Sequence, residues 1–184
     1  MISLFLIFAG VTLFVNGIWM WMDQSNRTRH LKLTGQDIAV VNIFTAIIGL
    51  VLMISIIAYG QNDNYYDYSA AAYIGLFSLT YLWLGINQFT GANGAALGWF
   101  ALIVPFIGIP AGLTALKHAN GVFETWLAID WFAWSALWFM FFLVLALGRN
   151  IQRATAGMTL AQSIGTALLP GILFFSGVVG FSQV

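Results

Sequence analysis

The chain has 184 residues, of which 61% are apolar and 7% are charged, and six basic side chains balance six acidic ones. Soluble domains carry about 25% charged residues and disordered chains are polar and poor in aromatics, so both classes are excluded. Nucleic-acid binding is excluded too, because no basic patch is present to neutralise phosphates. Uncharged runs cover residues 1–22, 38–62, 68–116 and 154–184, and about 20 apolar residues suffice to cross a bilayer.

These runs predict an all-α membrane protein, a bundle of six transmembrane helices in one domain over residues 1–184. The run 68–116 is too long for one span, and the Asn-Gly turn chemistry of segment 90–94 divides it. The first span has no Lys or Arg before it, so we expect it to be retained rather than cleaved as a signal peptide. The predicted helices lie near residues 2–22, 38–59, 69–90, 95–117, 124–147 and 157–182.

The six spans alternate in composition along the chain. The first, third and fifth carry bulky aromatics with embedded amides or hydroxyls, whereas the second, fourth and sixth are richer in Gly, Ala and Pro. Small residues allow helices to approach closely within a membrane. The alternation therefore predicts three repeated two-helix hairpins.

Basic residues are distributed unevenly among the connections between spans. The odd-numbered loops hold five of them, and the even-numbered loops hold only Lys117. Lys and Arg concentrate in cytoplasmic loops, which predicts both chain termini on the outside. The five are Arg27, Arg29, Lys32, Arg149 and Arg153.

No catalytic motif stands out. The sequence has no cysteine, only two histidines, and no metal-ligand spacing, nucleophile elbow or phosphate loop. We therefore expect neither an enzyme nor a cofactor or metal. Asp130 is the one charge well inside a span, which makes it a functional candidate. The alternative is a position near the outer interface, where it is hydrated or bonded to a tryptophan N–H.

The fifth span carries a tryptophan stripe. Trp131, Trp134 and Trp138 follow i, i+3, i+7 spacing and so share one helix face. Trp138 lies about two turns deeper than Trp131, beyond an interfacial aromatic belt. A tryptophan at that depth either packs in the core or lines a passage, and its N–H needs a partner or a hydrated lumen.

Uncharged polar side chains mark the other spans, namely Asn16, Thr80, Tyr81, Asn87 and a group at 162–166. Each of them can simply bond a neighbouring helix. Together they outline a path that suits a small, planar, neutral solute. Ions need rings of charge or carbonyls instead.

The sequence resembles the urea/amide channel family, which includes the acid-activated urea channel of gastric bacteria and the amide channels of amidase operons. The resemblance covers essentially the whole chain. Segments 88–89, 97–100 and 151–153 look closer to the amide branch. The main anchors are residues 1–6, Gly10, Asn16-Gly17, 80–83, 86–88, 131–138 and 166–170.

The resemblance implies a passive channel of the bacterial cytoplasmic membrane, with a pore in each protomer of a ring-shaped homohexamer in lipid. Its solutes are urea, acetamide and formamide, and a cytoplasmic urease or amidase consumes them. Asn16, Thr80, Asn87 and Trp131 are implied to flank the lining, and Gln162 stands where the gastric channel has a glutamate near its pore. The implied lining comprises Ile2, Leu6, Leu13, Phe77, Tyr81, Trp134, Leu137 and Trp138.

Acid gating is not carried over from the gastric channel, where it depends chiefly on external histidines. Here only His118 is expected outside, so we expect a channel that is open at neutral pH. Two other functions stay open, which are a proton-coupled amide transporter that uses Asp130, and a membrane protein that binds amides or acts as a scaffold without conducting. Exchange of Asp130 for Asn separates a channel from a coupled carrier.

Overall fold

A computed structural model describes residues 2–23, 33–59 and 65–181, and all regular structure in these ranges is helical. The predicted all-α bundle of six membrane-spanning helices is confirmed, because six helical segments are long and apolar enough to cross a bilayer. The sixth is built from three consecutive pieces, α6, η2 and α7. The elements are α1 (Ile2–Asp23), α2 (Gly35–Tyr59), α3 (Tyr65–Thr90), α4 (Ala95–His118), α5 (Val122–Leu145), α6 (Gln152–Gln162), η2 (Ser163–Leu168) and α7 (Leu169–Phe175).

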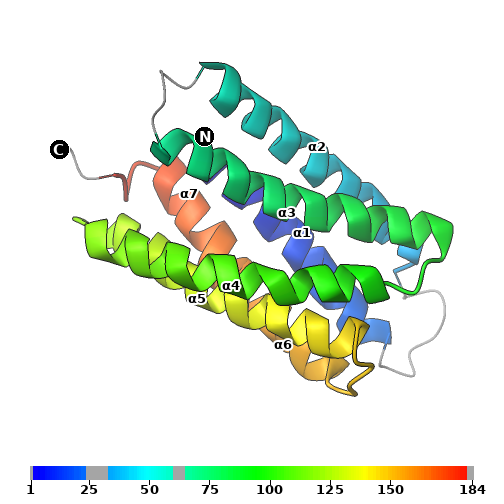
Figure 1. Cartoon of the computed structure of the whole chain (residues 1–184). Coiled ribbons are helices and arrows are strands. Elements are labelled where there is room, and N and C mark those ends of the chain that lie inside the picture. Colours follow the sequence, from blue (N-terminus) through cyan, green and yellow to red (C-terminus); the bar gives the residue numbers. More distant parts are fainter. Residues whose placement is uncertain (1, 24–32, 60–64, 182–184) are drawn as a thin grey trace.

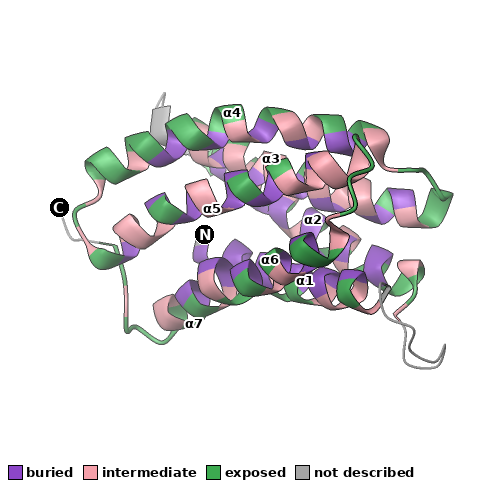
Figure 2. Ribbon diagram, turned by 90° about the horizontal axis from the view of Figure 1, so that it is seen from below, coloured by how far each residue is buried: buried purple, intermediate pink, exposed green. Residues whose placement is uncertain are grey.

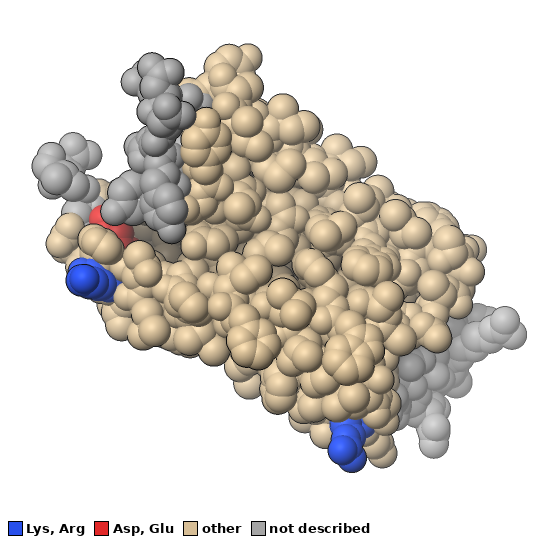
Figure 3. Space-filling view, in the orientation of Figure 1, with Lys and Arg blue, Asp and Glu red and all other residues tan. Residues whose placement is uncertain are grey.

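The helices run alongside one another, and α1 begins at the end of the bundle where α7 finishes (Figure 1). Buried residues face the interior and exposed ones face outward (Figure 2). The outward faces are strongly apolar, as Phe44 and Ile54 on α2 and Phe106 on α4 show. On the visible face, charged side chains lie only near the ends of the bundle (Figure 3). This distribution suits a hydrocarbon environment.

Three antiparallel helix pairs make up the bundle. The packing is most extensive between α2 and α3, between α4 and α5, and between α1 and the α6–η2–α7 rod. Each pair joins one aromatic-bearing odd-numbered span to one even-numbered span rich in small residues. The compositional alternation along the sequence is therefore an alternation between packing partners.

Glycines permit these close approaches. A Cβ on Gly10 of α1 would lie 2.7 Å from Leu168 Cγ, and one on Gly108 of α4 would lie 2.6 Å from Ser135 Oγ. Helix association in a bilayer depends on packing and hydrogen bonds rather than on hydrophobic burial. The missing side chains therefore allow the helices to pack at the distances seen here.

Polar side chains also join α1 to α2. The hydroxyls of Thr12 and Thr45 lie 2.7 Å apart. Asn16 Nδ2 donates to Asn42 Oδ1 at 3.1 Å, and Asn42 Nδ2 donates back to Asn16 Oδ1 at 2.7 Å. Asn42 Nδ2 also donates to the Ile38 carbonyl at 2.8 Å. These bonds fix the rotation of α1 and leave part of the Asn16 amide for other contacts.

The last helix ends earlier than the predicted residue 182. Gly177 has φ +73°, its N–H donates to the Phe174 carbonyl at 3.1 Å, and the Val178 N–H donates to the Leu173 carbonyl at 3.0 Å. This is a Schellman cap, and it stops α7 at Phe175. The same helix begins at Gln152, five residues before the predicted start, because a segment that contains Gln152, Arg153 and Thr155 extends it beyond the apolar run.

A π-helical segment interrupts the sixth helix at Ser163–Leu168, where the Leu169 N–H donates to the Ile164 carbonyl. Pro170 follows at once, and a proline cannot donate to the carbonyl four residues earlier. The wider turn accommodates this defect, and such segments frequently mark functional sites.

Candidate functional site

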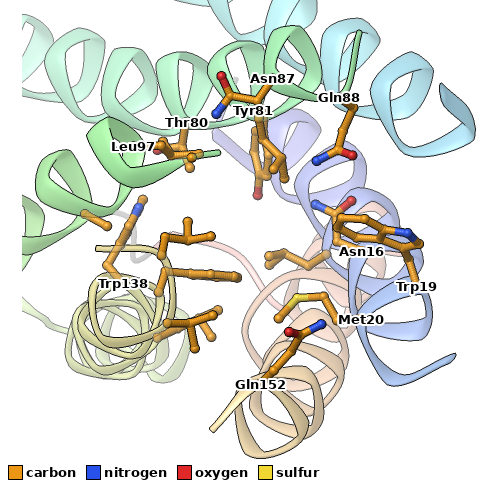
Figure 4. Close-up of a pocket in the computed structure, with 18 of the residues that line it drawn as sticks. Asn16, Trp19, Met20, Thr80, Tyr81, Asn87, Gln88, Leu97, Trp138 and Gln152 are labelled. Atoms are coloured by element: carbon orange, nitrogen blue, oxygen red, sulfur yellow. The ribbon is translucent and has the colours of Figure 1, made fainter. Parts of the chain in front are cut away.

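A cavity of about 220 Å³ lies between α1, α3, α4, α5 and the start of α6 (Figure 4). It extends from the α3–α4 turn at residues 92–94 to Phe77 and Trp134, which lie near the middle of their helices. None of the residues that line it is charged. The predicted pore residues that it brings together are Leu13, Asn16, Phe77, Thr80, Tyr81, Asn87, Trp134, Leu137 and Trp138.

An aromatic cluster closes the inner end of the cavity. The Phe77 ring centroid lies 4.5 Å from that of Trp138 and 5.0 Å from that of Trp134, the latter edge-to-face at 85°. Trp131 continues the cluster, 5.3 Å from Trp134 and 4.6 Å from Tyr73. Edge-to-face contacts stabilise aromatic pairs beyond the burial of their area. Phe77 thus joins α3 to the α5 tryptophan stripe.

The π segment holds two tryptophans of α5 through hydrogen bonds. Trp134 Nε1 donates to Thr166 Oγ1 at 2.8 Å, and Thr166 Oγ1 donates to the Gln162 carbonyl at 2.7 Å. Trp126 Nε1 donates to the Gly165 carbonyl at 2.9 Å. A buried N–H without a partner would cost about 1–3 kcal/mol. Both indoles are therefore satisfied and fixed in orientation.

Polar groups reach the cavity from two sides. The Tyr81 hydroxyl points into the open space, facing the side from which Asn16 and Met20 project (Figure 4). Tyr81 makes no hydrogen bond within the described part of the chain and is 4% exposed. Asn16 is held by Asn42, which leaves one N–H and one lone pair of its amide unused. A solute in the cavity therefore meets donors and acceptors as well as rings.

Four predicted residues lie outside this lining. Leu6 and Trp131 pack in the same aromatic cluster as Trp134, farther from the cavity. Gln162 is buried, and its Nε2 donates to the Ala133 carbonyl at 2.7 Å. Ile2 begins α1, and its side chain lies outside the described residues.

The sequence reasoning missed more than half of the lining. Helical periodicity extends from the residues that it did identify, since Trp19 and Met20 follow Asn16 by one turn and Leu84 follows Tyr81. The turn residues carried no such signal. The additional lining residues are Trp19, Met20, Leu84, Gln88, Ala92, Asn93, Gly94, Leu97, Ala101, Phe141, Val144, Leu145 and Gln152.

Asp130 lies away from the cavity, in a shallow depression formed with the α4–α5 turn and Trp126. It is 2% exposed, and its Oδ2 has no hydrogen-bond partner in the described ranges. The Trp126 N–H, a candidate partner from the sequence, bonds Gly165 instead. Within the same ranges, no three His, Cys, Asp or Glu side chains gather into a metal site.

Comparisons with known proteins place the chain among membrane transport proteins. The profile described as AmiS/UreI family transporter matches residues 1–178. The "Putative transporter protein AmiS2" of Rhodococcus erythropolis is 30% identical over 176 residues, which cover 95% of this chain and 79% of the relative. The "Acid-activated urea channel" of Helicobacter pylori is 26% identical over 201 residues, covering 95% and 97%. The cryoEM structure of the Helicobacter pylori urea channel in a closed state superposes with a TM-score of 0.83, at 25% identity, over 98% of this chain and 100% of that chain.

Proposed function

The chain belongs to the AmiS/UreI family of transporters, and from this membership and the cavity we propose that it is a passive channel for urea and short aliphatic amides. It is a multi-pass membrane protein, and its greater identity to AmiS2 than to the gastric urea channel agrees with the amide branch. The observation that carries the proposal is the lining of the cavity, which is uncharged, contains several aromatic rings and includes side-chain amides and hydroxyls.

The lining accounts for selectivity in physical terms. A neutral amide without hydrogen-bond partners costs a few kcal/mol to desolvate, and the Tyr81 hydroxyl and the Asn16 and Asn87 amides offset part of that cost. An ion costs far more, and the lining offers it no charge. The cavity is also smaller than the roughly 300–1,000 Å³ of sites for drug-sized ligands, which favours solutes of a few heavy atoms.

Flux without accumulation is the property that defines a channel. We expect radiolabelled acetamide and urea to enter proteoliposomes until the internal and external concentrations are equal, and to stop there with or without an imposed pH gradient. Vesicles without protein serve as the control. Accumulation above the external concentration would overturn the proposal.

Orientation and assembly form part of the same proposal. Arg149 and Arg153 lie at the end of the bundle where the cavity residue Gln152 lies, whereas Lys117 lies at the opposite end. Arg153 also stacks over the Trp21 ring at 4.8 Å. With this end cytoplasmic, both termini are outside. Arg27, Arg29 and Lys32, which the sequence assigns to the cytoplasmic loops, lie outside the described ranges. We further propose a homohexamer in lipid and a cytoplasmic amidase or urease that consumes the solute.

We expect little dependence of the flux on pH. His118 is exposed at the end of α4, where its Nδ1 lies 2.8 Å from the Thr114 carbonyl, far along α4 from the cavity residues Leu97 and Ala101. Histidine is the usual pH switch of proteins, and no histidine in the described ranges lines the cavity, so acetamide flux at pH 5.5 should stay within about twofold of flux at pH 7.5. A severalfold rise at pH 5.5 that disappears in His118→Ala would contradict the expectation.

A proton-coupled carrier is the second candidate, favoured by Asp130, whose buried Oδ2 has no hydrogen-bond partner among the described residues. If the protein is a channel, the Asp130→Asn variant should conduct acetamide at an unchanged rate, because Asp130 does not line the cavity. The assay is downhill uptake together with uptake under an inward proton gradient. Gradient-driven accumulation in the wild type that is lost in the variant would establish the carrier instead.

A further inference from the structure

The lining of the cavity away from the tryptophans is rich in one functional group. Five side chains that line it are primary carboxamides, four of which are labelled in Figure 4. They are Asn16, Asn87, Gln88, Asn93 and Gln152. The cavity therefore carries, at its end nearest the interhelical turns, the functional group that the proposed solutes themselves contain.

The use of these amides within the protein differs. Asn16 is paired with Asn42, and Asn93 Oδ1 accepts from the Ala95 N–H at 3.0 Å, at the start of α4. Asn87 is 7% exposed, yet its side chain makes no hydrogen bond within the described part of the chain. If protein enclosed the Asn87 amide atoms completely, they would count among the buried polar atoms without a partner, and they do not. The unused Asn87 amide is therefore open to the cavity, which Thr80 and Leu97 also line.

The structure contains an example of what such an amide binds. In the Asn16–Asn42 pair each NH₂ donates to the other carbonyl, with N···O distances of 3.1 and 2.7 Å. This cyclic pair needs a carbonyl and an N–H on the same edge of the partner. Acetamide, formamide and urea all present that edge, whereas an alcohol does not.

We propose that Asn87 is a specificity-determining residue, which pairs reciprocally with the carboxamide edge of the solute before or after it passes the aromatic cluster. The proposal rests on the proposed channel function. Thr80 lies seven residues before Asn87, on the same face of α3 and about 10 Å away along the axis. Asn87 thus contacts the solute roughly three turns of α3 away from Phe77, which together with Trp134 and Trp138 limits the shape of the solute.

A comparison of two isomeric solutes distinguishes recognition of the carboxamide edge from selection by size. Acetamide and N-methylformamide have the same atoms, but the dominant trans rotamer of N-methylformamide holds its N–H opposite the carbonyl. It can make single hydrogen bonds but not the cyclic pair. The ratio of their protein-dependent fluxes therefore measures recognition of the carboxamide edge, independently of molecular mass.

The test compares this ratio in proteoliposomes of the full chain, after subtraction of the flux in protein-free vesicles. Asn87→Leu, and the smaller Asn87→Ser in case the leucine variant fails to assemble, should lower the acetamide to N-methylformamide ratio by about fivefold, the equivalent of one hydrogen bond of about 1 kcal/mol. Asn87→Gln, which keeps the carboxamide, should retain a higher ratio than either. Thr90→Val is the matched control, because Thr90 is exposed on the same helix end and bonds only the Ile86 carbonyl.

Each failure has its own meaning. If the Asn87→Leu or Asn87→Ser variant still conducts acetamide and has the same flux ratio as the wild type, the proposed role of Asn87 is wrong and the channel function stands. An equal loss of both fluxes would assign Asn87 a structural role and also overturn the proposal. Absence of acetamide flux in the wild type would overturn the channel itself.

Discussion

Replacement of Phe77 by alanine should admit glycerol, a bulkier solute that we expect the wild-type aromatic cluster to exclude. The Phe77 ring lies 4.5, 5.0 and 6.3 Å from the ring centroids of Trp138, Trp134 and Trp131, so it is the α3 side chain that meets all three tryptophans. The surroundings of a deleted core side chain relax only partly, because Trp134 is anchored to Thr166. A gap should therefore remain where the ring was.

The expected size of the effect is large. We expect glycerol flux through Phe77→Ala to rise at least about tenfold, a barrier reduction of about 1.4 kcal/mol, while acetamide flux is not reduced. The measurement is stopped-flow light scattering on proteoliposomes. The control is Phe139→Ala, since Phe139 is exposed on the outer face of α5 and stacks only on Phe142 at 5.9 Å. If folded Phe77→Ala protein still excluded glycerol, Phe77 would not be part of the selective constriction.

Gly98→Ala should destabilise the protein more than an ordinary glycine substitution in this bundle. A Cβ at Gly98 would lie 2.6 Å from the backbone nitrogen of Ala146 and 2.9 Å from Leu145 Cβ. Because one of these neighbours is backbone, α4 and α5 must separate. Overpacking of this kind costs about 1–3 kcal/mol, so the thermal midpoint should fall by about 2–12 °C.

Gly157→Ala is the matched control for that substitution. Its Cβ would meet only Trp21 Cζ3, at 3.7 Å, so it gains helix propensity of about 1 kcal/mol without a clash. We expect its midpoint in detergent to be equal to or above that of the wild type. Equal midpoints for Gly98→Ala and Gly157→Ala would show that α4 and α5 do not need the close approach seen at Gly98.

The sequence predicted the spans well because bilayer crossing depends on composition over about 20 residues. The ends of helices depend on single residues instead. The positive φ of Gly177 ends α7 seven residues before the predicted position, and composition averaged over a window does not detect such a cap. The early start at Gln152 was not predicted for the opposite reason, since polar residues at a helix end lower the mean hydropathy and do not look like part of a membrane span.

The candidate site was predictable where it follows one helix face. Trp134, Leu137 and Trp138 line the cavity, whereas the spacing of the tryptophan stripe alone left core packing and a passage both open, and the family resemblance was what implied a pore. The partners of those residues were not predictable, because the Asn16–Asn42 pair and the Trp134–Thr166 bond depend on which helices meet and at what rotation. Gln162 illustrates the same limit, because its amide bonds the α5 backbone rather than lining the cavity.

The most direct test of the channel is the rate at which wild-type proteoliposomes equilibrate acetamide and glycerol, measured by stopped-flow light scattering in gradients of either direction. We expect rapid acetamide equilibration at equal rates inward and outward, with glycerol no faster than in protein-free vesicles. Acetamide rates equal to those of protein-free vesicles would contradict this expectation, and so would equal acceleration of both solutes.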